Sequence, residues 1–273
     1  MNTNKSIKKN KSIKKNFMYT LFYRVLAMFI PLVTTPYIAR VLGAEGVGIY
    51  SYTYSITAYF VLFGNFGSAT YAQLTIAKTQ NDKHNLSKLF YEILAARAIT
   101  MLAVIVIYMI FIINSEQYVT MFIVLSSVLI AELLNLGWFY QGIEEFKSIT
   151  IRNVIVKLVS VLLIFVLVNG QEDLYLYALI VNGSSVVGNI SLFLGLRKYL
   201  IKVNIKDLQV TKHFRGFLIY FVPAIASTIN TNLDKTMLGI ITNSKLENGF
   251  YELAYKMELM ILTVFSSINM VLR

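Results

Sequence analysis

Ten ionisable residues interrupt the long apolar stretches of this sequence, and three of them form the most informative set. Arg24, Arg97 and Lys157 each lie five to eight residues from one end of a different apolar segment. A charge at the centre of a bilayer costs roughly 2.5–3.5 kcal/mol. Three cations at similar depth could line a shared cavity and bind a phosphate or diphosphate through charge-assisted hydrogen bonds. The alternative is that each side chain extends to the nearby membrane interface.

Polar side chains also follow one face of the segment that contains Lys157. Asn153, Lys157 and Ser160 are spaced at i, i+4 and i+7, which places them on one side of a helix. Polar groups are costly in lipid. We therefore expect this stripe to face protein or water.

A second stripe, Ser227, Asn230 and Asp234, lies near the end of the chain with Lys235 beside it. Asp234 and Lys235 are neighbours in sequence, so they do not face each other on a helix. We expect Asp234 to meet a cation on another helix or to be a protonatable or ion-coordinating group; simple structural pairing is the alternative. Asp234, Lys235 and Glu132 are candidate gating or coupling residues.

The elements that position these residues are predicted to be transmembrane helices. The chain has 273 residues, a mean hydropathy of +0.62 and only 14% charged residues, against about 25% in a soluble domain. A span needs about 20 apolar residues, and lipid-embedded backbone must be helical or a closed barrel. The predicted fold is all-α and polytopic. The expected segments are 17–38, 49–76, 89–113, 118–140, 151–168, 174–196, 217–241 and 250–272, with a polar hinge at 39–48 and a bend or break near 64–67.

Composition argues against several classes of chemistry. The sequence has no cysteine, which excludes a disulfide framework and Cys-ligated metal sites. The two histidines, His84 and His213, lie in predicted loops. No glycine-rich phosphate loop or nucleophile elbow is present. We expect no metal, no cofactor and no catalytic residue.

The basic residues indicate orientation in a membrane rather than binding to nucleic acid. The net charge is +11. Seventeen Lys and Arg residues lie in the N-terminal tail and in alternate connections, against two in the remaining connections. Positive charge is retained on the cytoplasmic side. We therefore expect a multi-pass protein of the cell membrane with a cytoplasmic N-terminus and membrane lipids as partners.

Two sequence marks occur twice. Phe29-Ile30-Pro31 recurs in the form Phe-Val-Pro ending at Pro223, and the pattern Gly-x-Tyr-x3-Tyr occurs at 48–54 and 249–255. Chance similarity between apolar hairpins is the alternative to a repeat. A repeat of six helices predicts a basic cytoplasmic tail (1–16), a first lobe (17–196), a basic cytoplasmic loop (197–216) and the first two helices of a truncated second lobe (217–273). Pro31 and Pro223 are candidate hinges, since proline weakens a helix.

Three stretches carry a resemblance to a known family. The opening motif PLVTTPYIARVLG at 31–43, followed by Gly46-x-Gly48-x-Tyr50, resembles bacterial polysaccharide flippases of the multidrug/oligosaccharidyl-lipid/polysaccharide exporter superfamily. WFYQG at 138–142 is similar to the mid-chain pattern of that family. NLDKxMLG at 232–239 resembles its seventh-helix signature.

The resemblance implies a two-lobed transporter that moves an undecaprenyl-diphosphate-linked oligosaccharide from the inner to the outer leaflet. The substrate is then a polyprenyl-diphosphate-linked glycan, and a polysaccharide polymerase of the same pathway is a candidate partner. On this hypothesis Arg24, Arg97 and Lys157 hold the diphosphate. Two alternatives stay open: a drug or cation antiporter of the same superfamily, and a membrane enzyme of the polysaccharide pathway.

Overall fold

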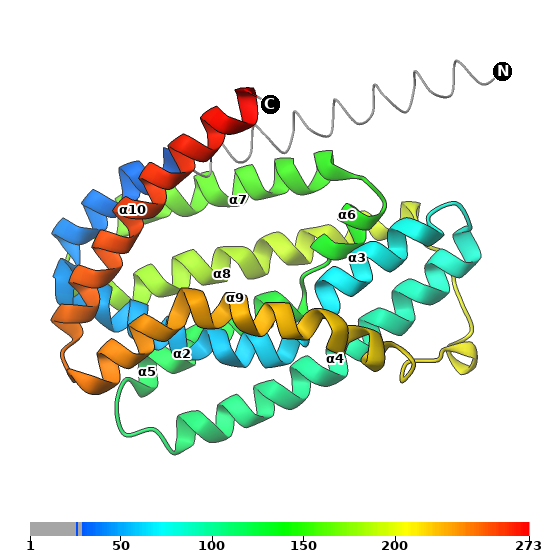
Figure 1. Cartoon of the computed structure of the whole chain (residues 1–273), viewed down its shortest axis with the longest axis horizontal. Coiled ribbons are helices and arrows are strands. Elements are labelled where there is room, and N and C mark those ends of the chain that lie inside the picture. Colours follow the sequence, from blue (N-terminus) through cyan, green and yellow to red (C-terminus); the bar gives the residue numbers. More distant parts are fainter. Residues whose placement is uncertain (1–25, 27–28, 273) are drawn as a thin grey trace.

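The computed structural model describes residues 26 and 29–272, and every regular element within them is a helix (Figure 1). The predicted all-α class is confirmed. Five helical stretches of the described chain are long and apolar enough to cross a membrane. They are α4 (Lys83–Ile113), α5 with α6 (Val119–Gly142), α7 (Phe146–Leu167), the stretch Gln171–Lys198 that contains α8 (Leu174–Phe193), and α9 (His213–Ile241). The predicted tail, 1–16, and Arg24 lie outside the described residues.

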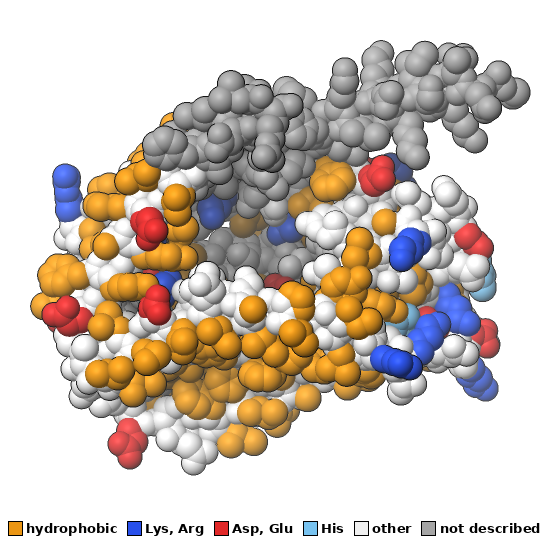
Figure 2. Space-filling view, viewed as in Figure 1, with side chains coloured by type: hydrophobic (Ala, Val, Ile, Leu, Met, Phe, Trp, Pro, Cys, Tyr) orange, Lys and Arg blue, Asp and Glu red, His pale blue; other side chains and the backbone are white. Residues whose placement is uncertain are grey.

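The surface of the bundle is divided between apolar and charged zones. Figure 2 shows a broad belt of apolar side chains across the middle of the molecule. Lys and Arg side chains gather at one end, where the α3–α4 connection and the segment before α9 lie. An apolar belt with polar ends is the surface expected of an integral membrane protein.

The predicted polar hinge at 39–48 is wrong. Helix continues from residue 29 to residue 41, and α2 (Gly43–Asn65) begins after Leu42 alone. Gly43 has φ +70°, a left-handed conformation that glycine adopts without steric cost. One residue therefore redirects the chain, and the polar residues that follow form the first turns of α2.

The predicted break near 64–67 is confirmed. After α2 ends, Phe66 (φ +47°) and Gly67 (φ +73°) are both left-handed, and α3 (Ser68–Thr79) begins. Gly67 also lies directly against the backbone of α9, because a Cβ here would overlap the carbonyl of Phe217 and the amide nitrogen of Phe221. Glycine thus allows both the turn and the close approach.

A second break divides the predicted segment 118–140. It contains α5 (Val119–Leu133) and the short α6 (Gly137–Gly142). The side-chain oxygen of Asn135 accepts a hydrogen bond from the Gly137 amide at 2.8 Å and satisfies a backbone donor at the start of α6. Trp138 and Phe139 of α6 pack on Phe90 of α4, with ring centroids 5.5 and 4.8 Å away. This break places α6 beside the cavity described below.

The two copies of the repeated glycine mark meet in the structure. α10 (Lys245–Leu272) packs closely along α2. A Cβ on Gly48 would overlap the carbonyl oxygen of Lys245, and a Cβ on Gly249 would overlap that of Ala44. Residues 44 and 245 are 201 positions apart, and so are residues 48 and 249. A pseudo-twofold axis therefore relates the contact of Gly48 with Lys245 to the contact of Gly249 with Ala44. Each glycine therefore allows the backbone of the other helix to approach closely.

Candidate functional site

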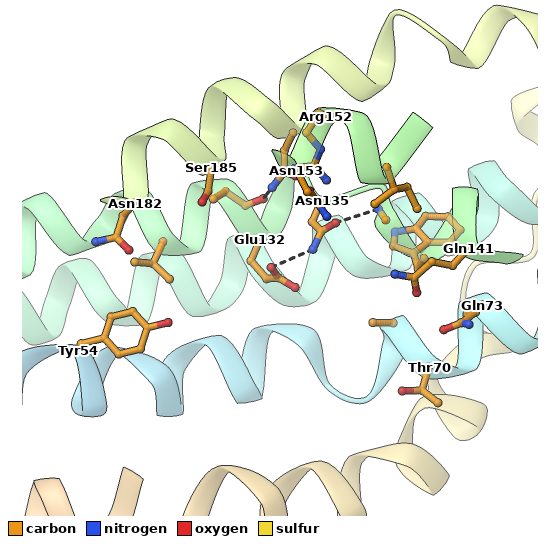
Figure 3. A pocket seen from close by; sticks show the side chains of 17 residues that line it. Tyr54, Thr70, Gln73, Glu132, Asn135, Gln141, Arg152, Asn153, Asn182 and Ser185 are labelled. Atoms are coloured by element: carbon orange, nitrogen blue, oxygen red, sulfur yellow. Dashed lines mark hydrogen bonds between the residues drawn. The ribbon is translucent and has the colours of Figure 1, made fainter. Parts of the chain in front are cut away.

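A polar cavity of about 540 Å³ lies inside the bundle (Figure 3). Six helices surround it, and α7 and α8 form one wall while α2 and α3 form the opposite one. The lining residues are Tyr54 of α2, Ala69, Thr70 and Gln73 of α3, Val128, Ala131 and Glu132 of α5, Asn135, Gly137, Trp138 and Gln141 at α6, Ile149, Arg152 and Asn153 of α7, and Asn182, Ser185 and Asn189 of α8.

Carboxamides dominate the polar lining. In Figure 3, Tyr54 and Asn182 lie at one end of the cavity and Gln73 and Gln141 at the other. Each carboxamide presents an acceptor oxygen and two N–H donors. A wall with many such groups can hydrogen-bond to neutral ligands that carry many hydroxyl or acetamido groups.

Some of these amides are held in fixed positions. The Asn189 oxygen accepts a hydrogen bond from Arg152 Nη1 at 2.9 Å, while its nitrogen donates to the Ala131 carbonyl at 2.6 Å. Asn189 therefore ties α8 to both α7 and α5. The Asn182 nitrogen donates to the Ala178 carbonyl at 2.8 Å and to Tyr50 Oη at 3.3 Å. These bonds orient the cavity wall in advance of any ligand.

Two charged side chains, Glu132 and Arg152, also line the cavity. The Glu132 carboxylate accepts hydrogen bonds from Asn65 Nδ2 at 2.9 Å and Asn135 Nδ2 at 3.2 Å. Figure 3 shows Glu132 between the amide-rich ends, and Arg152 beside Asn153 on the opposite wall. With one cation and one carboxylate, the lining is close to neutral.

Trp138 supplies an unused hydrogen-bond donor. Its side chain is 3% exposed and lines the cavity. Among the described residues its indole Nε1 has no hydrogen-bond partner. Buried polar groups are normally paired, and an unpaired one costs about 1–3 kcal/mol. An acceptor oxygen of a ligand or a water would satisfy it.

A second cavity of about 420 Å³ adjoins the first. The two share Tyr54, Ala69 and Thr70, so they meet at α2 and α3. The helix α9 closes the second cavity with Thr228, Thr231, Asn232 and Lys235. Groups of His, Asp or Glu that could hold a metal ion do not occur within the part of the chain that the structure describes.

The predicted cation Arg97 lies behind the cavity wall. It is 4% exposed and donates to Ser68 Oγ (3.0 Å), Asn65 Oδ1 (3.2 Å) and the backbone oxygen of Glu132 (3.4 Å). Its guanidinium also lies 5.8 Å from the Trp138 ring centroid. These contacts join α4 to the α2–α3 break and to α5.

Among the described residues, the predicted cations Arg97 and Lys157 do not line a common cavity, and Arg24 lies outside the described residues. Lys157 is exposed on α7 and does not line either cavity, whereas Asn153, from the same predicted stripe, does. Lys157 follows Asn153 by one helical turn on the same face of α7, and it lies beyond the residues that line the cavity. Diphosphate binding by Arg24, Arg97 and Lys157 stays a prediction.

The candidate gating residues of α9 form contacts with α10. Asp234 Oδ2 accepts a hydrogen bond from Tyr251 Oη at 2.7 Å, in place of the expected cation. Lys235 Nζ lies 2.7 Å from Glu252 Oε2, which also accepts a 2.9 Å bond from Ser51 Oγ of α2. Ser51 and Glu252 are 201 residues apart, the separation that also relates the repeated glycines.

The candidate hinges lie within continuous helix. Pro31 is inside the helix at 29–41, and Pro223 is inside α9. Neither interrupts its helix, and their role as hinges stays a prediction.

Most of the amides were not among the predicted site residues, although one signal was available. Asn182, Ser185 and Asn189 occur at i, i+3 and i+7 in α8, the spacing of a single helix face. Polar stripes were predicted only for the segments that form α7 and α9. Asn135 lies in the break between α5 and α6 and Gln141 lies in the short α6, where periodicity gives little signal, whereas Gln73 lies within α3.

Comparison with known proteins yields a family match and a related protein. The family model described as "Polysaccharide biosynthesis protein" matches residues 13–272. The protein of Escherichia coli (strain K12) named "Putative O-antigen transporter" is 26% identical over 260 residues, which cover 92% of this chain and 60% of the relative. The chain thus spans about 60% of the length of the relative it matches. No solved structure matches the chain.

The helices and the cavity are those of an integral membrane protein whose helices surround a polar, amide-lined cavity. The family match covers nearly all of the sequence. The chain belongs to the polysaccharide biosynthesis protein family.

Proposed function

We propose that this protein translocates lipid-linked oligosaccharide units across the bacterial cell membrane for surface polysaccharide synthesis. The observation that carries the proposal is the cavity of about 540 Å³ with its six carboxamides. Sugar hydroxyl and acetamido groups each need donors and acceptors when they leave water. The E. coli relative named as an O-antigen transporter supports the same class of substrate.

The substrate is a polyprenyl diphosphate, of the undecaprenyl type, that carries a short glycan. The glycan occupies the amide-lined cavity while the polyprenyl chain stays in the bilayer. Nothing is bonded or cleaved, so the protein acts as a transporter and not as an enzyme. The N-terminus is cytoplasmic, and substrate enters from the inner leaflet.

Alternating access between two repeats moves the glycan. The reciprocal contact of Gly48 and Gly249 across α2 and α10 supports two related halves. The cluster of Lys235, Glu252 and Ser51 lies on the same interface. Polar contacts at such an interface can exchange partners between two conformations, which makes this cluster the gating element.

Reconstitution tests the proposal directly. The purified chain is placed in liposomes that contain a fluorescent polyprenyl-diphosphate-linked oligosaccharide, and a membrane-impermeant quencher reports the label in the outer leaflet. We expect the chain to accelerate exchange between leaflets, and an Asn153→Leu, Ser185→Leu variant to reduce it. Exchange no faster than in protein-free liposomes, or export of organic cations in its place, would contradict the proposal.

A further inference from the structure

A separate groove runs along the surface between α7 and α8. Its volume is about 700 Å³, and it lies where α7 begins and α8 ends. The two helices run side by side in Figure 1. The lining residues are Glu145, Lys147, Ser148, Ile151, Arg152, Ile155, Val156, Val187, Gly188, Ser191, Lys198 and Tyr199.

One end of this groove is cationic. Lys147, Arg152 and Lys198 line it with a single carboxylate, Glu145. That carboxylate is engaged by Tyr199, whose pKa is raised to about 12 by burial and by its hydrogen bond with Glu145. The Tyr199 hydroxyl therefore stays protonated as a donor, and three cations face one already hydrogen-bonded carboxylate.

The remainder of the groove is apolar and open to the surroundings of the bundle. Ile151, Ile155 and Val187 are 45%, 55% and 69% exposed. Exposed aliphatic side chains on membrane-spanning helices face hydrocarbon. The groove is thus cationic at one end, at a membrane interface. The rest of it is a row of aliphatic side chains that continues toward the bilayer interior.

Arg152 belongs to both the groove and the amide-lined cavity. The two helices can meet around it because position 188 is glycine. A Cβ on Gly188 would lie 2.6 Å from Val156 Cγ2 and 3.2 Å from Arg152 Cδ. Arg152 therefore lies where the amide-lined cavity, which suits a glycan, meets the groove, which suits a lipid.

We propose that the α7–α8 groove is the loading site for the lipid part of the substrate, with Lys147, Arg152 and Lys198 binding the diphosphate and the aliphatic wall binding the first part of the polyprenyl chain. This inference rests on the proposed function for the identity of the lipid. Charge complementarity selects a phosphorylated head group, and the exposed aliphatic wall selects a ligand with a hydrocarbon chain over a free anion. The attached glycan then passes Arg152 into the cavity.

Binding of a glycan-free polyprenyl diphosphate to the purified chain in detergent tests the groove. We expect a Lys147→Gln, Lys198→Gln variant to bind about tenfold more weakly or worse, because each basic residue near a membrane surface strengthens binding of an anionic head group several-fold. Lys202→Gln, Lys206→Gln is the matched control. It removes two exposed lysines that follow the groove in sequence but do not line it, and its affinity should be unchanged.

Inorganic pyrophosphate forms the second arm of the experiment. It should bind far more weakly than the polyprenyl diphosphate; equal affinities would overturn the lipid site in favour of a free-anion site. Equal loss in both lysine pairs, or loss in neither, would also overturn it. A melting curve for each variant confirms that the chain is folded before its affinity is compared.

The leaflet-exchange assay separates this inference from the proposed function. If the groove variant transports at the full rate, the groove assignment is wrong while the proposed function stands. If polyprenyl diphosphate binds as described but the chain catalyses no exchange, the groove assignment stands and the proposed function is wrong.

Discussion

The amide-lined cavity and the α7–α8 groove lie on two sides of the same helix pair and use different chemistry. The cavity presents six carboxamides around one cation and one carboxylate. The groove presents three cations, one carboxylate and four aliphatic side chains. Arg152 is the charged side chain that both contain. The difference shows how one chain can hold an amphipathic ligand, with hydrogen bonds for its neutral part and charge with hydrocarbon for the rest.

Removal of Arg152 is expected to have the largest effect because it damages both sites. A hydrogen bond to a charged group contributes about 1.5–3 kcal/mol, so Arg152→Ala should weaken binding of the glycan-bearing lipid roughly 10- to 100-fold. Arg152→Lys should recover part of the loss. Arg197→Ala, at an exposed position outside both sites, is the control. A fully active Arg152→Ala variant would remove the proposed junction.

Changes within the cavity are expected to affect only the glycan. Asn153→Leu should lower affinity for the glycan-bearing lipid about tenfold, because a lost hydrogen bond also leaves ligand groups unpaired. Affinity for the glycan-free polyprenyl diphosphate should not change. The measurement is a pair of titrations, one with each lipid. Equal losses for both lipids would show that the cavity and the groove are not chemically distinct.

Salt should distinguish the electrostatic contribution of the groove from the neutral hydrogen bonds of the cavity without any mutation. Exposed charges are screened beyond about 8–10 Å at 0.1–0.15 M ionic strength. Raising the salt concentration from 0.05 to 0.5 M should therefore weaken binding of the glycan-free lipid several-fold. The ratio of affinities for the two lipids should stay nearly constant, since it reports neutral hydrogen bonds. A ratio that falls with salt would indicate that charge also selects the glycan.

Arg97 is expected to affect stability more than binding. Arg97→Met leaves Ser68 and Asn65 without their donor, and should lower the free energy of unfolding by roughly 2–3 kcal/mol. Ligand affinity, measured per folded molecule, should change least of all these variants. Loss of affinity with unchanged stability would instead support the direct diphosphate contact that the sequence suggests. Chemical denaturation followed by helical circular dichroism provides the stability measurement.

Sequence patterns predicted the helices well and the cavity poorly, for a physical reason. Apolar length and the glycines at 64 and 67 indicate helices and one break, because these depend on local chain properties. The break at Asn135 depends on a side chain that caps a short helix, and the turn at Gly43 needs only one residue. The break at Asn135 was missed because the surrounding composition remains apolar. The interruption at 39–48 was predicted too long because its polar residues are compatible with helix.

The candidate site illustrates the same limit. Charged residues are the most conspicuous candidates in an apolar sequence. The buried Arg97, however, holds α4 against its neighbours, and neutral amides line the cavity. An unpaired arginine in apolar surroundings would be costly, so the fold surrounds it with acceptors. The partners of a buried charge depend on tertiary contacts that a linear pattern does not contain.

Because the sequence contains no cysteine, single introduced cysteines give the most direct test of whether one ligand occupies both the cavity and the groove. Ser185 of α8 lines the cavity, and Ser191 of the same helix lines the groove. Ser185→Cys and Ser191→Cys are each labelled with a maleimide in the presence of saturating lipid. The account predicts that the glycan-bearing lipid protects both thiols, whereas the glycan-free polyprenyl diphosphate protects only the one at 191. Equal protection of both thiols by the glycan-free lipid, or protection of neither by the complete ligand, would contradict it.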